Sequence, residues 1–303
     1  MLKKDLQFIQ FRNDSCLLKR EDKNGKVFLI VYVDDCMVLG DKAAVKKALD
    51  DIEKFFSITR KEGIEDFIGC RIERDGNRAM LSQPYLIQKL LKKFEKKIEN
   101  LKEYDVPAPT GSHIMRCKTE EEKITEDEQM EYRSGVGSLL YLLKHSRPEL
   151  SNCVRELSKV MDGANKKHQK ALYRVIKFVE ETKNRKLILE PIRRDDLKWE
   201  MKAFSDSDFA GDVDLRKSVS GYIIYLCGAP IAWRSKGQKS VSLSSTDAEY
   251  MAVSEVAMEI LYIVGILNFL GVEVKYPIEV NVDNIGAVYL SKKRNNREQN
   301  KTH

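Results

Sequence analysis

The first hydrophobic pattern along the chain predicts a hairpin followed by a helix. Residues 26–40 (KVFLIVYVDDCMVLG) contain two runs rich in β-branched residues, one on each side of Asp34 and Asp35. Such runs are typical of paired strands, so we expect an acidic pair at the tip of the hairpin. Residues 41–52 then place apolar side chains at helical spacing, with Asp41 as the expected N-cap.

A second hairpin and a second helix are expected next. Residues 67–81 hold two strand-like runs that turn through Asp75 and Gly76. A helix with a lysine-rich outer face is predicted from residue 85 to about residue 101. Residues 105–125 contain Pro, Gly and a run of charges without periodicity, so a loop is expected there.

Three helical patterns follow the loop, over residues 125–144, 148–161 and 165–182. Basic residues outnumber acidic ones roughly two to one between residues 144 and 198, which makes this the most basic region of any length. Solvated helix faces explain such a region without a ligand. A polyanionic partner is the alternative.

The pattern changes near residues 190–196, where we place a domain boundary. A long amphipathic helix is predicted over 247–270, ending at Gly271 in the manner of a glycine C-cap. The last elements are a strand over 278–282 and a helix from Asn284. Before the long helix, strand-like runs occur at 197–205, 219–226, 230–234 and 240–243.

Composition narrows the class of protein without deciding the function. The 303 residues are 42% hydrophobic and 33% charged, which is a globular balance that suits about two domains. The net charge of +6 permits a nucleic-acid partner. Six cysteines without a CxxC pair favour a reducing compartment and argue against a zinc site. We expect no signal peptide and no membrane partner, because no apolar run approaches ~20 residues.

Three acidic residues stand where they can converge. Asp206 ends the first strand of the second half, Glu249 lies in the first turn of the long helix, and Asp283 ends the later strand. Strand ends and a helix start can share one rim of a sheet, and carboxylates there are suitable ligands for Mg²⁺. Two such ions can position water and stabilise the leaving oxygen of a phosphodiester.

Each of these acids also has a purely structural explanation. Thr246 and Glu249 have the spacing of a capping box, so Glu249 could serve only to end the helix. Asp283 could be a helix N-cap, and Asp206 a turn residue. The order and spacing of all three together favour the metal site.

The surrounding motifs resemble a known family. Residues 204–252 (FSDSDFAGDVDLRKSVSGYIIYLCGAPIAWRSKGQKSVSLSSTDAEYMA) and the later VNVDNIGAVYL resemble the ribonuclease H domain of copia-type LTR retrotransposon Pol polyproteins. The resemblance implies that Asp206, Glu249 and Asp283 are catalytic and bind Mg²⁺ or Mn²⁺. Asp208 and Asp212 belong to the same motif and are expected to have supporting or structural roles.

The first half resembles the reverse transcriptase of the same polyproteins, through LIVYVDDCMVLG and DFIGCRIERD. The later EYRSGVGSLLYLLKHSRPEL resembles the segment that joins polymerase to ribonuclease H. By this resemblance Asp34 is a direct metal ligand, Asp35 its neighbour and Tyr32 a residue near the primer end. The implied fold is α/β (α+β), with a partial polymerase palm, a helical thumb or connection segment and a ribonuclease H-like mixed sheet. These parts are expected over residues 1–104, 105–196 and 197–303.

Two departures from the family limit the expected activity. From the resemblance we expect the palm segment with the other metal-binding Asp to lie upstream of this sequence, and therefore expect no autonomous DNA synthesis. The family motif with a fourth nuclease acid would follow His303, and the last strand and helix of the ribonuclease H core are expected to be missing. The three remaining acids are expected to hold a second ion weakly, so nuclease activity would be impaired.

The implied ancestral chemistry is RNA-directed DNA synthesis and two-metal hydrolysis of RNA in RNA–DNA hybrids. A non-catalytic nucleic-acid-binding remnant and a decayed gene product are the alternatives. The expected partners are a hybrid or duplex and other Pol segments supplied in trans. The family implies cytoplasmic virus-like particles, with the nucleus as the other candidate location. The expected nucleic-acid-binding residues are Lys166, Lys167, Lys170, Arg174, Lys177, Lys236, Lys292, Lys293 and Arg294.

Overall fold

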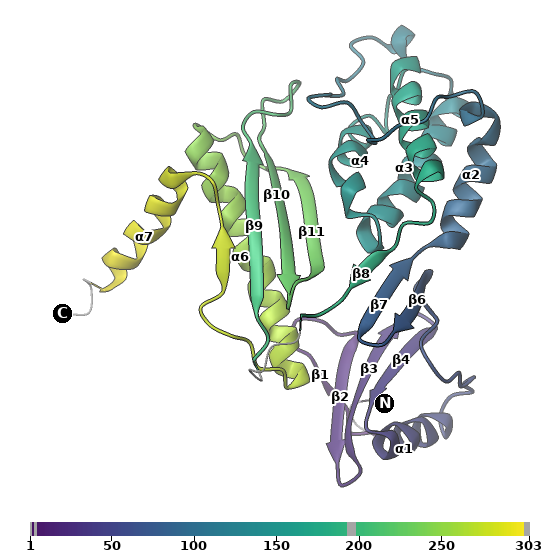
Figure 1. The fold of residues 1–303 in the computed structure, drawn as a ribbon, viewed down its shortest axis with the longest axis vertical. Coiled ribbons are helices and arrows are strands. Elements are labelled where there is room, and N and C mark those ends of the chain that lie inside the picture. Colours follow the sequence, from purple (N-terminus) through teal and green to yellow (C-terminus); the bar gives the residue numbers. More distant parts are fainter. Residues whose placement is uncertain (1, 3–4, 193–197, 300–303) are drawn as a thin grey trace. The chain divides into compact units, whose positions relative to one another are not determined.

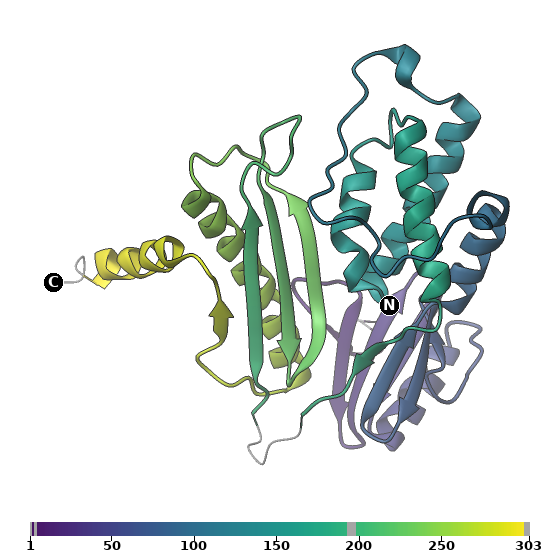
Figure 2. The same cartoon turned by 45° about the horizontal axis from the view of Figure 1, so that its top comes forward.

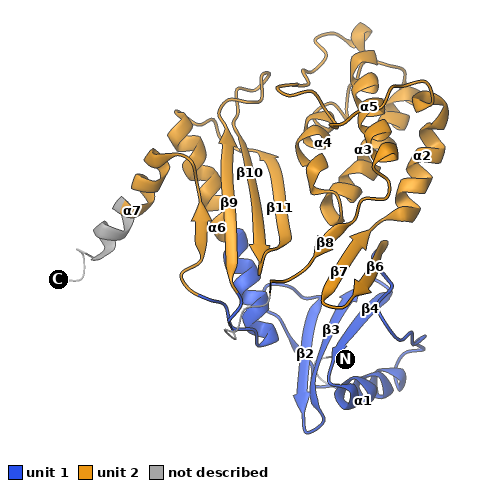
Figure 3. Cartoon of the chain, in the orientation of Figure 1, with its two compact units in different colours: residues 1–68, 195–199, 259–275 blue, residues 69–194, 200–258, 276–303 orange. Residues whose placement is uncertain are grey.

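The computed structural model describes residues 2, 5–192 and 198–299, with side chains as far as residue 292. The chain is a mixture of helices and strands, as the sequence predicts (Figure 1). It divides into two compact units (Figure 3), and the three expected segments stay a prediction. Unit 1 comprises Met1–Ile68, Asp195–Trp199 and Glu259–Lys275, and unit 2 comprises Gly69–Arg194, Glu200–Met258 and Tyr276–His303.

Unit 1 contains an antiparallel sheet in the order β1-β2-β3-β4, which confirms the first predicted hairpin. Tyr32 pairs with Asp35, so Val33 and Asp34 form the turn. Val33 has a φ of 52°, a strained value for a β-branched residue. The elements of this unit include β1 (Ile9–Gln10), β2 (Leu17–Asp22), β3 (Gly25–Tyr32), β4 (Asp35–Gly40), α1 (Lys42–Glu53) and β5 (Asp66–Phe67).

Asp41 has a different role from the one that the sequence predicted. It occupies the N-cap position of α1, but its side chain makes no capping hydrogen bond. Its Oδ2 instead accepts the backbone N–H of Lys26 at 2.7 Å. The prediction of a side-chain cap is therefore wrong, because the carboxylate is used to join the helix start to the beginning of the hairpin.

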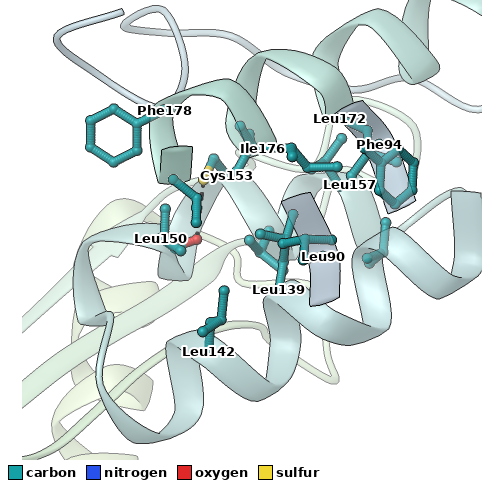
Figure 4. Packing of buried hydrophobic residues seen from close by; sticks show 14 of the residues in the cluster. Leu90, Phe94, Leu139, Leu142, Leu150, Cys153, Leu157, Leu172, Ile176 and Phe178 are labelled. Atoms are coloured by element: carbon teal, nitrogen blue, oxygen red, sulfur yellow. Dashed lines mark hydrogen bonds between the residues drawn. The ribbon is translucent and has the colours of Figure 1, made fainter. Parts of the chain in front are cut away.

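Unit 2 contains a helical bundle, whose helices follow the predicted periodicity closely. Its helices enclose an apolar core that includes Phe94, Leu139 and Ile176, all of them almost fully buried (Figure 4). Capping boxes fix two helix starts, at Thr125 with Glu128 and at Asn165 with His168. The helices are α2 (Pro84–Ile98), α3 (Glu126–His145), α4 (Ser151–Ser158) and α5 (Lys166–Glu181), with short 3₁₀ turns at Glu120–Glu122 and Pro148–Leu150.

A small sheet adjoins the bundle within unit 2. The predicted second hairpin is confirmed as β6 (Cys70–Asp75) and β7 (Arg78–Ser82), with Gly76 in the turn at a φ of 58°. The sequence did not predict β8 (Leu187–Leu189), which pairs antiparallel with β7. This strand is short, and its partner lies more than a hundred residues earlier, so local periodicity carries no signal for it.

The second sheet of unit 2 has the order β11-β10-β9-β12, with β12 parallel to β9 and the other pairs antiparallel. Residues 245–258 of helix α6 (Ser245–Leu270), the part that belongs to unit 2, lie against one face of this sheet (Figures 1 and 2). The long helix ends at Gly271 with a φ of 80°, as predicted. The remaining elements are β9 (Met201–Asp208), β10 (Val219–Leu226), β11 (Ala229–Gly237), β12 (Glu279–Asn281) and α7 (Ile285–Gln299).

The strand predicted over residues 240–243 is not present. This segment is irregular, and the hydroxyl of Ser242 donates to Oε1 of Gln238 at 2.6 Å. The amide of Gln238 also donates to the carbonyl of Ala248 at 2.9 Å, on the first turns of α6. The segment is held by side chains rather than by a neighbouring strand. The expected boundary at residues 190–196 lies largely outside the described residues.

Helix α6 is long and apolar enough to cross a membrane by length and composition alone, contrary to the expectation from its shorter apolar runs. A core helix of a globular domain has the same composition. Ala248, Ala252 and Val256 are completely buried. The absence of a membrane partner stays a prediction.

Candidate metal site

Asp206, Glu249 and Asp283 meet at one edge of the second sheet. Each offers a carboxylate oxygen, and the three oxygens lie within 4.8 Å of one another. The parallel register explains why the two aspartates meet: Phe204 pairs with Asn281, and each aspartate is two residues further along its own chain segment. The sequence therefore predicted both the members and the convergence of this cluster, which we call the acid trio.

Glu249 is the buried member, with 5% of its surface exposed. Its Oε1 accepts the backbone N–H and the hydroxyl of Ser207, at 3.0 and 2.8 Å. Burial raises the pKa of Glu249, the negative charges of Asp206 and Asp283 add to this, and the two bonds from Ser207 oppose it. Its Oε2 is buried without a hydrogen-bond partner. A cation among the three oxygens would satisfy this atom and offset the repulsion, so the residues fit a divalent metal.

The structural explanations for two of the acids do not hold. Ser244 caps α6 by accepting the N–H of Asp247, and the Asp247 carboxylate accepts the N–H of Leu243. Glu249 therefore has no part in capping its helix. Asn284 accepts the N–H of Ala287 at the start of α7, so Asp283 is not the cap of that helix.

Asp206 is likewise not a turn residue. It lies within β9 and pairs with Gly221 on β10. Asp212, from the same sequence motif, is buried and accepts the backbone N–H groups of Asp214 and Leu215 at 3.1 and 3.0 Å. These bonds shape a loop, so Asp212 contributes no oxygen to the acid trio.

A cleft of about 490 Å³ opens beside the acid trio. It reaches the end of β12 at Asn281 and the two residues that follow this strand. Asp206 and Asp283 both line it, so two of the three carboxylates are accessible to a ligand. The cleft is lined by Phe204, Ser205, Asp206, Gly221, Tyr222, Ile223, Asn281, Val282 and Asp283.

The acidic hairpin of unit 1 has a different environment. Tyr32, Asp34 and Asp35 are all exposed at the tip of β3 and β4. Among the described residues, three or more potential metal ligands come close together only in the acid trio. Neither hairpin aspartate belongs to this group. The role of Asp34 as a metal ligand, and the catalytic roles of Asp34 and Asp35, stay predictions.

Comparison with known proteins decides the family. The chain is 31% identical over 300 residues to the Retrovirus-related Pol polyprotein from transposon TNT 1-94 of Nicotiana tabacum, which covers 95% of this chain. It is 34% and 33% identical to the corresponding polyproteins from transposons RE1 and RE2 of Arabidopsis thaliana, each over 93% of the chain. The chain belongs to the retrotransposon Pol polyproteins.

This Pol segment spans about a fifth of the length of the curated relatives: 22% of the tobacco protein and 19% of each Arabidopsis protein. No protein-family model and no solved structure matches it. The family resemblance seen in the motifs is thereby confirmed at the level of a Pol segment.

Several expected nucleic-acid-binding residues of the Pol segment are engaged within the bundle. Lys166 pairs with Glu128. The Arg174 guanidinium lies 4.2 Å from the centre of the Tyr104 ring. Lys177 pairs with two neighbouring acids on its own helix and is mostly buried. The structure therefore gives these three cations intramolecular roles.

The other expected cations lie at the surface. Lys167 and Lys170 are exposed on α5, Lys236 on β11 and Lys292 on α7. The side chains of Lys293 and Arg294 lie outside the described residues. The sequence-based reasoning missed Ser207, the partner of Glu249. Its position directly after Asp206 was the available signal.

Proposed function

We propose that this Pol segment carries a ribonuclease H-type site, in which the acid trio binds Mg²⁺ or Mn²⁺ and the RNA strand of an RNA–DNA hybrid is hydrolysed. The convergence of Asp206, Glu249 and Asp283 within 4.8 Å carries this proposal. Three carboxylates held so closely repel one another and leave a buried oxygen unsatisfied. Such an arrangement suits a site that exists to bind cations.

The three residues of the trio have different proposed roles. Glu249 is fixed by Ser207 and buried, so it provides a rigid ligand. Asp206 and Asp283 are exposed and line the cleft, so their carboxylates can hold a metal, a water molecule or both toward a phosphate. A bound divalent ion would lower the pKa of water and polarise the phosphodiester.

Lys236 is our candidate for a contact with a nucleic-acid strand near the trio. It pairs with Ser220 on β10, which in turn pairs with Ser207 on β9. Two strand spacings put Lys236 on the order of 10 Å from Ser207. An exposed cation at that distance suits a neighbouring backbone phosphate, a contact that is independent of sequence and weakened by salt.

Cleavage of an end-labelled RNA–DNA hybrid by the purified chain with Mg²⁺ or Mn²⁺ tests the proposal. We expect cleavage of the RNA strand, and a loss of at least about 100-fold for Asp206→Asn, because one charged ligand is removed. Asp208→Asn is the matched control, since it neutralises an acid two residues away that is outside the trio. Cleavage that survives Asp206→Asn would contradict the proposal.

Binding without turnover is the other outcome with a distinct signature. A folded chain that binds the hybrid in a salt-dependent manner but leaves it intact would support a nucleic-acid-binding role alone. Isothermal titration calorimetry with Mn²⁺ then shows whether a chain that binds the hybrid without cleaving it still binds metal. The titration reports on the acid trio and does not require catalysis.

A further inference from the structure

Gly221 is an unexpected residue at the centre of a sheet. It lies in β10, between Asp206 on β9 and Ser235 on β11. Glycine in a strand interior loses backbone entropy and contributes no packing, and it often marks a place where a ligand approaches closely.

No feature of the protein itself requires glycine at this position. Gly221 does not have a positive φ. A Cβ atom added there would meet only the carbonyl oxygens of Arg234 and Asp206, both at 3.9 Å, which is ordinary contact. At Gly211, by contrast, a Cβ would lie 1.9 Å from Oδ2 of Asp208, so the fold itself excludes a side chain there.

The space left by Gly221 belongs to the cleft beside the acid trio. Gly221 and Asp206 are directly opposite one another on adjacent strands and both line the cleft. A side chain at position 221 would therefore stand about 5 Å from that of Asp206.

We propose that Gly221 admits the sugar–phosphate backbone of a nucleic-acid strand to the acid trio. The missing side chain leaves the floor of the cleft open, so a sugar next to the reacting phosphate can rest against β10 while the phosphate faces Asp206 and Asp283. This inference rests on the proposed ribonuclease function and names the feature that lets the substrate reach the site.

Gly221→Val tests the inference, because valine favours strands and has room within the fold. Hybrid binding is measured by fluorescence anisotropy with Ca²⁺ in place of Mg²⁺, and Mn²⁺ binding by calorimetry. We expect hybrid affinity to fall at least about 10-fold while Mn²⁺ affinity stays within 2-fold, and Gly221→Ala to show an intermediate loss. Gly237→Val is the matched control, since a Cβ at that β11 position meets nothing within 4 Å.

The outcomes separate this inference from the proposed function. Equal hybrid affinity of Gly221→Val and the unmodified chain overturns the role of Gly221 and leaves the metal site intact. Weaker Mn²⁺ binding by Gly221→Val also overturns it, because the variant would then act by distorting the trio. An unmodified chain that binds no Mn²⁺ contradicts the proposed function itself, and this inference falls with it.

Discussion

His168 is a histidine built into the start of α5. It is 6% exposed, and its Nδ1 accepts the backbone N–H of Asn165 at 3.0 Å. Burial lowers its pKa from the ordinary value of 6.5, Lys167 lowers it further, and a bond with the backbone of Met115 and the charge of Asp214 oppose this. A protonated Nδ1 could not accept the capping hydrogen bond, so the folded chain favours the neutral ring.

The first prediction follows from this histidine. Because the unfolded chain binds the proton more readily, stability falls as the pH drops through 6.5, by at most about 1.4 kcal/mol per pH unit for one proton. Urea unfolding at pH 7.5 and 5.5 measures this. His168→Gln keeps an acceptor and should reduce the pH dependence, whereas His113→Gln, at an exposed position, should keep it. Identical pH profiles for the two variants would contradict the role of His168.

At the residue scale, the sequence predicted which acids meet but not what surrounds them. The acid trio was recognisable because its members follow one another along the chain at two predicted strand ends and one predicted helix start. The bond from Ser207 to Glu249 and the opening at Gly221 depend on strand register, which periodicity does not define. The sequence also suggested Arg174 as a ligand-binding residue, because its contact with Tyr104 depends on tertiary packing. The partners of Lys177 lie three and four residues further along the same helix, so helical spacing was an available signal for them.

At the element scale, the C-terminal half of α6 is held by aromatic contacts within unit 1. The Phe11 ring lies 5.3 Å from the ring of Phe269 and 6.4 Å from that of Tyr262. Gly265 gives Phe11 its space, because a Cβ there would lie 3.2 Å from the end of the Phe11 ring. Lys19 donates to the Phe269 carbonyl at 3.1 Å and helps to end the helix.

A double-mutant cycle tests this contact. Gly265→Ala is expected to destabilise the unmodified chain, because the added methyl group presses on Phe11. In a Phe11→Ala background the same change should stabilise by about 0.5–1 kcal/mol, since glycine is a poor helix former and the obstruction is gone. Hydrogen exchange of the α6 amides and urea unfolding measure the effect. Gly137→Ala is the control, because a Cβ atom there meets nothing within 4 Å, and it should stabilise the chain in both backgrounds. If the effects of Gly265→Ala and Phe11→Ala simply add, the contact between these residues is refuted.

The elements themselves show where sequence patterns suffice. β10 occupies residues 219–226 as predicted, because its buried and partly exposed positions alternate along most of its length. The segment 240–243 has a similar composition but is irregular, because Ser242 bonds to Gln238. β8 escaped prediction because its three residues become a strand only through pairing with β7. Local patterns thus predict elements that carry their own period and miss those created by distant partners.

At the scale of the whole molecule, buried ion pairs join the helical bundle of unit 2 to the sheet with the acid trio. Lys159, on the turn after α4, lies 2.8 Å from Oε1 of Glu156 and 3.5 Å from Oδ2 of Asp212. Arg155 pairs with the same glutamate at 2.7 Å and donates to the hydroxyl of Ser235 on β11. Burial of Asp212 raises the pKa of its carboxyl group. The backbone N–H of Leu215, the charge of Lys159 and the backbone N–H of Asp214 lower it by more, so the pKa lies below its ordinary value.

These ion pairs predict that the bundle and the sheet unfold together. Lys159→Met leaves the buried carboxylates of Glu156 and Asp212 without their shared cation, so it should destabilise unit 2 by about 3–5 kcal/mol. It should also separate one unfolding transition into two. In a Trp199→Phe background, fluorescence reports on Trp233 of β11 alone, and far-ultraviolet circular dichroism follows the helices. Lys166→Met, which removes an exposed cation paired with Glu128, should cost less than about 1 kcal/mol and keep a single transition. If Lys159→Met costs no more than this control, the pairs contribute little and the bundle and the sheet are joined by apolar packing instead.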